Sequence, residues 1–274
     1  MRGRWAVLAL VVLLGAAIGA PFVASYSPEH VDLAHRREPP SHTHWFGTDE
    51  LGRDVFARVL YGARVSLAVG LLSAAVAGAS GATIGGIAGY AGGALDNLLM
   101  RATDAVLAVP RLPLLMIAGA VLQPSVAVLV VLIGLAGWME TARVTRAEFL
   151  SLRTREFVAA ARALGAGHAR VVAAHLLPNA APAVIVSMTL AVARAILLES
   201  ALSFFGVGVR PPQASWGNML YQAQSALTSE PWLALFPGIF IFVTALSVNL
   251  LGEHLATGGD DLRRQPAKSA ITGK

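Results

Sequence analysis

The sequence predicts an all-α integral membrane protein with about six transmembrane helices. Of its 274 residues, 55% are hydrophobic and only 14% are charged, and the mean hydropathy is +0.63. Soluble domains usually carry about 25% charged residues, so this chain has too few charges to cover a large soluble enzyme. The apolar residues also form blocks long enough to cross a bilayer as helices, which takes about 20 residues each.

Residues 5–24 form the first uncharged apolar stretch. Arg2 and Arg4 precede it, so a signal peptide is an alternative interpretation. The apolar run is longer than that of a typical signal peptide, and Pro21 would obstruct cleavage after Ala20. We therefore expect an uncleaved first transmembrane helix.

A polar segment, residues 25–64, separates this helix from the second span. It contains four of the seven histidines and several charges. We expect an exposed, extended segment outside the membrane that ends in a short helix near residues 49–61. The second span, residues 65–90, has no charge.

The third span, residues 98–122, contains charges and two prolines. Arg101 and Asp104 are three residues apart, so they share a helix face and can pair near the membrane surface. Pro110 and Pro113 should kink the helix, because proline cannot donate a backbone hydrogen bond.

The second half of the chain supplies three more spans, residues 125–139, 182–205 and 232–251. A basic, alanine-rich loop, residues 140–179, separates the first two. These elements divide the chain into an N-terminal helix with its outer segment (residues 1–64), a transmembrane core (65–256) and a tail (257–274).

The distribution of basic residues predicts that both termini lie in the cytoplasm. This orientation places thirteen lysines and arginines inside and six outside, as the positive-inside rule requires. The same spread of charges explains the net charge of +5 without a nucleic-acid partner, since the bases form no dense run.

Four glycines lie at intervals of four residues near the end of the second span: Gly81, Gly85, Gly89 and Gly93. This spacing puts them on one helix face, where a neighbouring helix backbone can approach closely. The face could be a static packing surface or a sliding surface between moving helices.

Four ionisable residues fall near or inside predicted spans: Asp104, Arg111, Arg194 and Glu199. A charge at the bilayer centre costs on the order of 2.5–3.5 kcal/mol on insertion scales. We expect these groups to face protein or a watery cavity. They line a solute pathway, pair within the fold, or lie closer to the membrane interface than these span boundaries place them.

The loop between the fourth and fifth spans contains a short predicted helix, residues 157–164. Its sequence, Glu156-Phe-Val-Ala-Ala-Ala-Arg-Ala-Leu-Gly165, consists mainly of strong helix formers, and Gly165 is well placed to end it. Small alanines on its surface would let it sit in a groove on a partner protein.

This loop resembles the signature loop of bacterial ABC importer permeases, which contains Glu-Ala-Ala, three residues and Gly. The match sets Ala159, Ala160 and Ala161 on the Glu-Ala-Ala positions, so that Ala159 stands where the family has glutamate. The resemblance assigns contact with an ATPase to this loop: Glu156, Ala159, Ala160, Ala161, Arg162, Leu164 and Gly165.

Further segments resemble the dipeptide/oligopeptide/nickel permeases, and most closely their second permease subunit, usually given a C suffix. They are Phe46-Gly-Thr-Asp-Glu-Leu-Gly-Arg-Asp54, Tyr61-Gly-Ala-Arg64, Gly89-Tyr-Ala-Gly-Gly93, Leu202-Ser-Phe-Phe-Gly206, Ser215-Trp-Gly217 and Asn249-Leu-Leu-Gly252. They follow one another in order along nearly the whole chain.

The resemblance implies a type I ABC importer permease fold in the bacterial cytoplasmic membrane. It implies a second, homologous permease, two ATPase subunits that bind ATP and magnesium, and an extracytoplasmic substrate-binding protein. The sequence itself contains no Gly-x-x-x-x-Gly-Lys-Ser/Thr phosphate loop. We therefore expect no cofactor and no catalytic residue in this chain, and peptide import by alternating access.

Three alternative functions are compatible with parts of the sequence. The same fold could import nickel or another small solute. A secondary, ion-coupled transporter could use Asp104 and Glu199, but it would more often show paired broken helices in two halves, and no such repeat is visible. A metal-dependent membrane enzyme is disfavoured, because the histidines form no His-Glu-x-x-His pattern.

Overall fold

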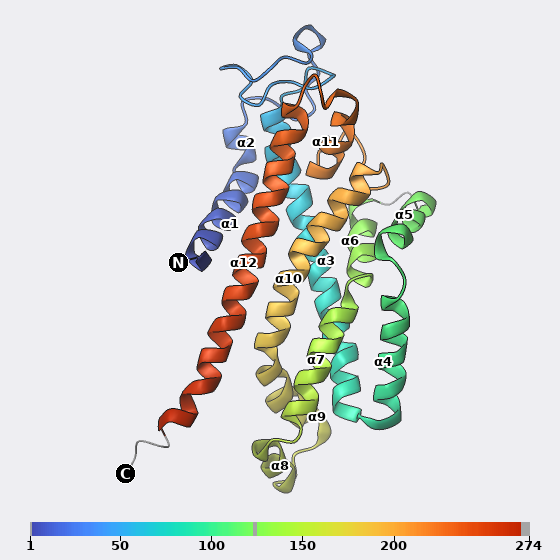
Figure 1. Cartoon of the computed structure of the whole chain (residues 1–274), viewed down its shortest axis with the longest axis vertical. Helices are drawn as coiled ribbons and strands as arrows, with labels where there is room; N and C mark the ends of the chain where they lie inside the picture. The colour runs from blue at the N-terminus through green and yellow to red at the C-terminus, as the bar shows by residue number, and fades with distance from the viewer. Residues whose placement is uncertain (1, 123–124, 270–274) are drawn as a thin grey trace.

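The computed structural model describes residues 2–122 and 125–269. It is an elongated helical bundle (Figure 1), and the described residues form no strand beyond one isolated bridge. A polar segment, residues 24–54, and the short helix α11 (Trp216–Ala223) cover one end, here called the cap end. Helices α8 (Glu156–Ala163) and α9 (His168–Arg170) lie at the opposite end, here called the α8 end. The predicted all-helical class is confirmed.

The long helices run between these two ends, and α3 runs through the bundle (Figure 1). The remaining elements are α1 (Arg2–Ile18), α2 (Ala20–Val23), η1 (Leu33–His35), α3 (Val55–Ala91), α4 (Gly93–Leu107), α5 (Arg111–Leu122), α6 (Val126–Leu135), α7 (Trp138–Leu152), η2 (Val171–Leu176), α10 (Leu177–Phe204), η3 (Gln224–Ala226) and α12 (Trp232–Ser269).

Among the described residues, three stretches are long and apolar enough to cross a membrane as single helices: Val55–Ala91, His168–Phe204 and Trp232–Thr257. Two bent pairs, α4 with α5 and α6 with α7, pass the same test together. The first predicted span is the shorter apolar helix α1, followed by α2. All six predicted apolar segments are therefore helical.

Helix α3 is longer than predicted. The short helix expected near residues 49–61 and the second span are one unbroken helix of 37 residues, about 55 Å long at 1.5 Å per residue. It begins at Asp54, whose side chain accepts a hydrogen bond from the Ala57 amide at 2.7 Å. It ends at Gly92, which has a φ of 67°.

The third predicted span is broken, as its prolines predicted. Helices α4 and α5 meet at 78°, and Pro110 lies in the break between Leu107 and Arg111. The fourth span is also bent, by 44°, between α6 and α7. Because α7 continues to Leu152, much of the segment predicted as a loop, residues 140–179, is helical.

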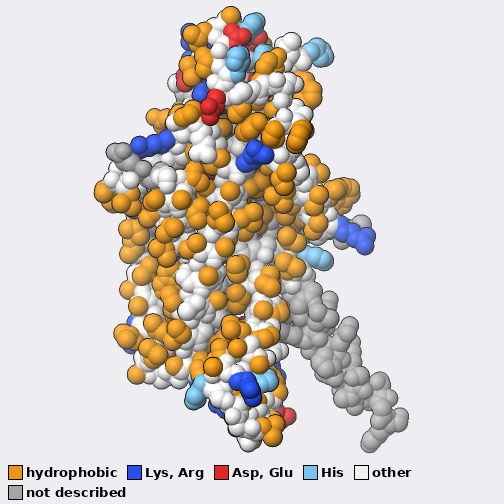
Figure 2. Space-filling model, turned by 180° about the vertical axis from the view of Figure 1, so that it is seen from behind, with side chains coloured by type: hydrophobic (Ala, Val, Ile, Leu, Met, Phe, Trp, Pro, Cys, Tyr) orange, Lys and Arg blue, Asp and Glu red, His pale blue; other side chains and the backbone are white. Residues whose placement is uncertain are grey.

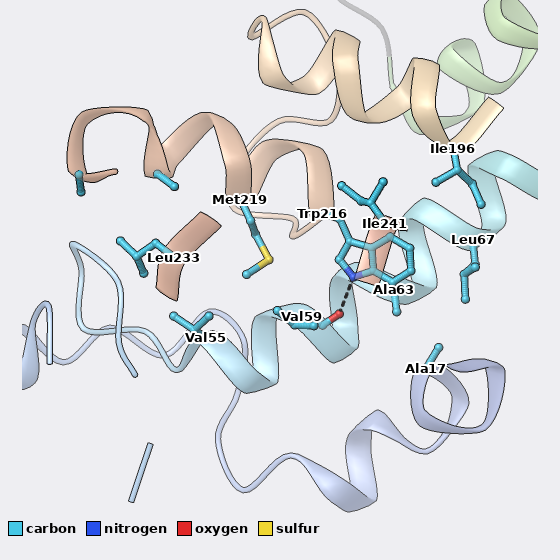
Figure 3. Packing of buried hydrophobic residues seen from close by; sticks show 12 residues of the cluster. Ala17, Val55, Val59, Ala63, Leu67, Ile196, Trp216, Met219, Leu233 and Ile241 are labelled. Carbon is cyan, nitrogen blue, oxygen red and sulfur yellow. Dashed lines mark hydrogen bonds between the residues drawn. The ribbon is translucent and has the colours of Figure 1, made fainter. Parts of the chain in front are cut away.

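Apolar packing near the cap end is centred on Trp216 of α11 (Figure 3). This side chain is fully buried among residues of α3, α10 and α12, including Val59, Leu67 and Ile196. Its indole Nε1 donates a hydrogen bond to the Val59 carbonyl at 3.0 Å. The contact attaches α11 to the first turns of α3.

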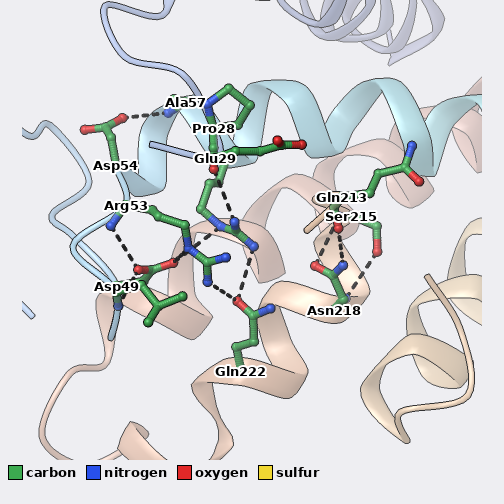
Figure 4. Close-up of polar contacts among 12 residues, drawn as sticks. Pro28, Glu29, Asp49, Arg53, Asp54, Ala57, Gln213, Ser215, Asn218 and Gln222 are labelled. Carbon is green, nitrogen blue, oxygen red and sulfur yellow. Dashed lines mark hydrogen bonds and ion pairs between the residues drawn. The ribbon is translucent and has the colours of Figure 1, made fainter. Parts of the chain in front are cut away.

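A polar cluster joins the cap segment to α11 (Figure 4). The Asp49 carboxylate accepts from Arg53 Nε at 2.7 Å and lies 3.5 Å from Arg58 Nε. Both arginines also donate to Gln222 Oε1, at 3.0 and 3.2 Å. Arg58 is almost completely buried, so these contacts supply partners that its charge requires.

The histidines of the cap segment are less uniformly exposed than predicted. His35 is exposed, and its hydrogen bond to Asp32 raises the pKa of the imidazole and lowers the pKa of the carboxyl group. His44 is mostly buried and contacts Asp54 at 2.8 Å. Asp54 caps α3, so His44 belongs to the structure that fixes the start of that helix.

The outer surface agrees with a membrane setting. Hydrophobic side chains cover most of the middle of the face shown in Figure 2, and most charged side chains and histidines lie toward its ends, with a few at the right-hand edge at mid-height. Exposed apolar residues such as Leu72, Leu98, Ile117 and Phe242 belong to this surface. Lipid is the solvent in which such a surface is stable.

Candidate functional site

Helix α8 is fixed at the tip of the α8 end by one buried face. Val158 is fully buried and packs with Phe149 of α7 and with Val171 and Leu176, which lead into α10. The sequence predicted this helix at residues 157–164, within one residue of its observed bounds. Helix α8 is therefore attached by packing to α7 and to the start of α10.

Gly165 ends α8 as predicted. It has a φ of +85°, a conformation that glycine adopts without a steric penalty. Its amide donates to the Arg162 carbonyl at 2.9 Å, and the Ala166 amide donates to the Ala161 carbonyl at 3.0 Å. This pair of bonds is a Schellman motif, and it turns the chain away from the exposed surface of α8.

The opposite face of α8 is uncovered in the isolated chain. Leu164 is 90% exposed and Phe157 is 42% exposed. The remaining exposed residues assigned to ATPase contact are Glu156, Ala159, Ala160, Arg162 and Gly165, and Ala161 is half-buried. The result is a small-residue surface flanked by two large apolar side chains, which is suited to a protein partner.

Arginines connect this end to the last turn of α3. Arg153 Nη1 donates to the carbonyls of Gly89 and Tyr90 at 3.2 and 3.3 Å. The guanidinium of Arg162 lies 5.8 Å from the centre of the Tyr90 ring, within the range of a cation–π interaction. Helix α3 is thus the third long helix in contact with the α8 region.

Three of the four predicted packing glycines bring α7 against α3. A Cβ on Gly81, Gly85 or Gly89 would lie 2.5, 2.1 or 2.7 Å from a backbone oxygen of α7. Gly93 is different, since it has a φ of +60° and starts α4 after α3 has ended. Its expected place on the packing face is wrong, because Gly92 reverses the chain one residue earlier.

The predicted pair of Arg101 with Asp104 is replaced by another pair. Asp104 contacts Arg143 of α7, and both side chains are more than half exposed. A further α4–α7 pair, Asp96 with Arg146, was not singled out from the sequence. The bend between α6 and α7 brings α7 alongside α4, and the chain order gave no signal for these contacts.

Arg111 and Arg194 both contact Glu140, and these three residues are here called the charged cluster. Arg111 Nη2 donates to Glu140 Oε1 at 2.8 Å, and Arg194 forms an ion pair with the other carboxylate oxygen. Glu140 was predicted as the start of a loop. The apolar run that ends immediately before it is the signal that could have placed it inside a membrane-spanning pair.

Glu199 is completely buried and surrounded by serines. It accepts hydrogen bonds from Ser203 Oγ at 2.8 Å and from Ser66 Oγ of α3 at 3.1 Å. Ser66 in turn accepts a hydrogen bond from the Trp216 amide. Glu199 therefore joins α3, α10 and α11 inside the protein, and it is no part of an exposed pathway surface in this structure.

Within the described residues, no group of three or more His, Asp or Glu side chains is placed to hold a metal ion. The ionisable groups instead form ion pairs between helices, such as Arg111–Glu140 and Asp96–Arg146. These ion pairs connect α5 to α7 and α4 to α7.

Residues 81–258 match the family described as binding-protein-dependent transport system inner membrane component. The dipeptide transport system permease protein DppC of Bacillus subtilis is 40% identical over 97% of this chain and 82% of its own length. The oligopeptide transport system permease protein OppC of the same organism is 38% identical, over 94% and 84% respectively. A putative peptide permease of Brucella suis is 41% identical, over 95% and 88%.

Proposed function

Because this chain belongs to the family of binding-protein-dependent transport system inner membrane components, we propose that it is a permease subunit of an ABC importer for peptides. It is a multi-pass membrane protein and a transport subunit. The peptide cargo is supported by the printed names of relatives that cover most of the chain, one for dipeptides and one for oligopeptides.

One observation carries the proposal for the mechanism. Helix α8 exposes a small-residue surface on one side, and on the other it packs against α7 and the start of α10. ATP binding to two partner ATPases would press on this helix. The movement would pass through α7, α10 and α3 and change which end of the bundle is open, which requires a bias of a few kcal/mol between two packings.

The remaining partners follow from the same proposal of an ABC importer. We propose a homologous second permease that completes the pathway and a binding protein that docks at the cap end. ATP and magnesium would bind to the ATPases, since the sequence has no phosphate loop of its own. The membrane would be the bacterial cytoplasmic membrane.

The experiment that tests this proposal is a change on the exposed face of α8. We expect Ala160→Glu to abolish co-purification of the ATPases and to lower ATP-driven peptide uptake at least tenfold. Ala160 is exposed, so the variant should fold, but the new carboxylate would be desolvated at the docking surface. The measurement is a pull-down in mild detergent, followed by uptake into proteoliposomes of labelled alanine peptides that differ in length.

Ala94→Glu is the matched control for this test. Ala94 is also exposed and lies near the same end, in the first turn of α4, where an acidic side chain is favourable. We expect uptake within twofold of the wild type. Equal ATPase recovery from both variants would contradict the docking role of α8. Uptake of nickel without uptake of peptide would show that the cargo is nickel and not a peptide.

We further propose that the α8 end and both termini face the cytoplasm. The basic residues around α8 support this orientation, because Arg153, Arg155, Arg162 and Arg170 lie at that end. The sequence has no cysteine, so a single new one reports its own position. In intact cells, a membrane-impermeant maleimide should label His42→Cys in the cap segment but not Ala169→Cys in α9. The reverse pattern would invert the topology.

A further inference from the structure

An open groove lies between α7, α10 and α12, with a volume of about 410 Å³. Most of its lining is apolar, including Val144, Val186 and Leu190. Two acidic side chains and one basic side chain also line it: Glu140, Glu148 and Arg194. Glu140 and Arg194 belong to the charged cluster, so the groove and the cluster form one surface.

Arg194 lies within a stretch that is long and apolar enough to cross a membrane, residues 168–204. Arg194 is ten residues before Phe204, the last residue of α10, which corresponds to about 15 Å along the helix. That is half of a hydrocarbon core about 30 Å thick. The side chains of Arg194 and Glu140 are nevertheless 41% and 33% exposed. Charged groups at this depth are unstable against lipid, so this surface must face water or another protein.

Two helix breaks meet at the charged cluster. Arg111 is the first residue of α5, directly after the 78° break, and Glu140 lies in the first turn of α7, after the 44° break. Non-helical backbone at membrane depth is stable only inside protein or beside a water-filled cavity. Arg111 and Arg194 also line a second, smaller cavity among α3, α6 and α10. Both breaks therefore lie beside internal space.

We propose that this groove is the surface of the chain that contacts the transported solute, and that Arg194 of the charged cluster binds a carboxylate of the solute. The inference rests on the proposed function and names the substrate class that its pathway accepts. Arginine forms paired hydrogen bonds with a carboxylate, and the charged cluster holds two arginines for one glutamate. A peptide supplies the carboxylate at its C-terminus, whereas the apolar wall tolerates varied side chains.

A cluster that only holds α5, α7 and α10 together is the competing explanation, and accessibility to water tests it first. Val186→Cys and Leu190→Cys place single thiols in the groove. Ile185→Cys is the matched control, since Ile185 is 52% exposed on the same helix but outside the groove lining. The probe is a membrane-impermeant methanethiosulfonate reagent, applied to the complete transporter in nanodiscs.

We expect both groove thiols to react at least tenfold faster than the thiol at position 185, because thiolates form in water and not in lipid. Peptide present during ATP turnover should slow the reaction at the groove positions and leave the control unchanged. Groove thiols that react no faster than the control would overturn the inference.

Exchange of the two charges tests recognition. The double variant Glu140→Arg with Arg194→Glu retains an ion pair but reverses its direction. We expect it to assemble in normal amount and to lower uptake of the peptide that the wild type carries at least tenfold, as should Arg194→Gln. Arg143→Gln, which removes an ion pair on α7 outside the groove, should leave uptake within twofold.

Recovery of uptake to within twofold by the exchanged pair would show a purely structural role and overturn the inference. If the exchanged variant does not assemble, the thiol comparison decides, because its variants keep every charge. Failure of the proposed function is distinguishable, since the wild type would then lack bound ATPases or ATP-driven uptake. The thiol reaction rates report on the groove in either case.

Discussion

Trp216→Ala is expected to lower the free energy of unfolding by about 3–5 kcal/mol, the usual cost of truncating a buried tryptophan. The side chain is fully buried and contacts α3, α10 and α12. Its removal leaves a cavity that these helices cannot fill without moving, and it also leaves the Val59 carbonyl without the indole donor. Thermal unfolding of the purified protein in detergent, followed by size-exclusion chromatography, is the measurement.

Two further variants serve as comparisons for Trp216→Ala. Trp216→Phe keeps a buried ring but loses the hydrogen bond, so its cost should be clearly smaller. Trp45→Ala makes the same truncation at the cap end, where Trp45 is 61% exposed, and should change the free energy by less than about 1 kcal/mol. Equal effects of Trp216→Ala and Trp45→Ala would show that α11 is not attached through its tryptophan.

Gly85→Ala is expected to destabilise the protein by about 1–3 kcal/mol, the range for overpacking a tightly packed interior. The added Cβ would lie 2.1 Å from the Ala142 carbonyl oxygen and 2.8 Å from its carbon. Backbone atoms cannot rotate away, so α7 must separate from α3. Because α7 joins the α8 region to the charged cluster, peptide uptake should fall together with stability.

Gly238→Ala in α12 is the matched control. A Cβ at this position meets no atom within 4 Å, and alanine favours a helix over glycine by roughly 0.5–1 kcal/mol. We expect unchanged or slightly higher stability in the same chromatographic assay. A similar loss of stability in both variants would show that the cost comes from replacing any glycine within a helix, and not from the close approach of α7.

Much of the fold could be predicted because each membrane-spanning helix needs a long apolar run. Such a run is visible in one sequence, and the prolines at the third span marked its break correctly. Helix α8 and its end at Gly165 were also local features, determined by helix formers and one glycine. The resemblance to importer permeases then supplied the class of function.

The missing parts depend on contacts between distant segments. Glu140 follows an apolar run, which by itself predicts the start of a loop, although two arginines from other helices contact it. Asp104 faces Arg143 because α7 lies beside α4, and no local spacing encodes that neighbour. Gly93 continues the spacing of four residues, but α3 ends at Gly92, so Gly93 no longer lies on the packing face of that helix.

The continuity of α3 has a mechanical consequence. Its first turns are attached to the cap through Arg58 and the Val59 carbonyl, and its last turn is attached to the α8 region through Arg153. If this unbroken helix of about 55 Å tilts as a rigid body by about 5°, its far end moves by about 5 Å. In the mechanism proposed above, a small push from an ATPase would thereby become a movement wide enough to admit a water molecule or a peptide backbone.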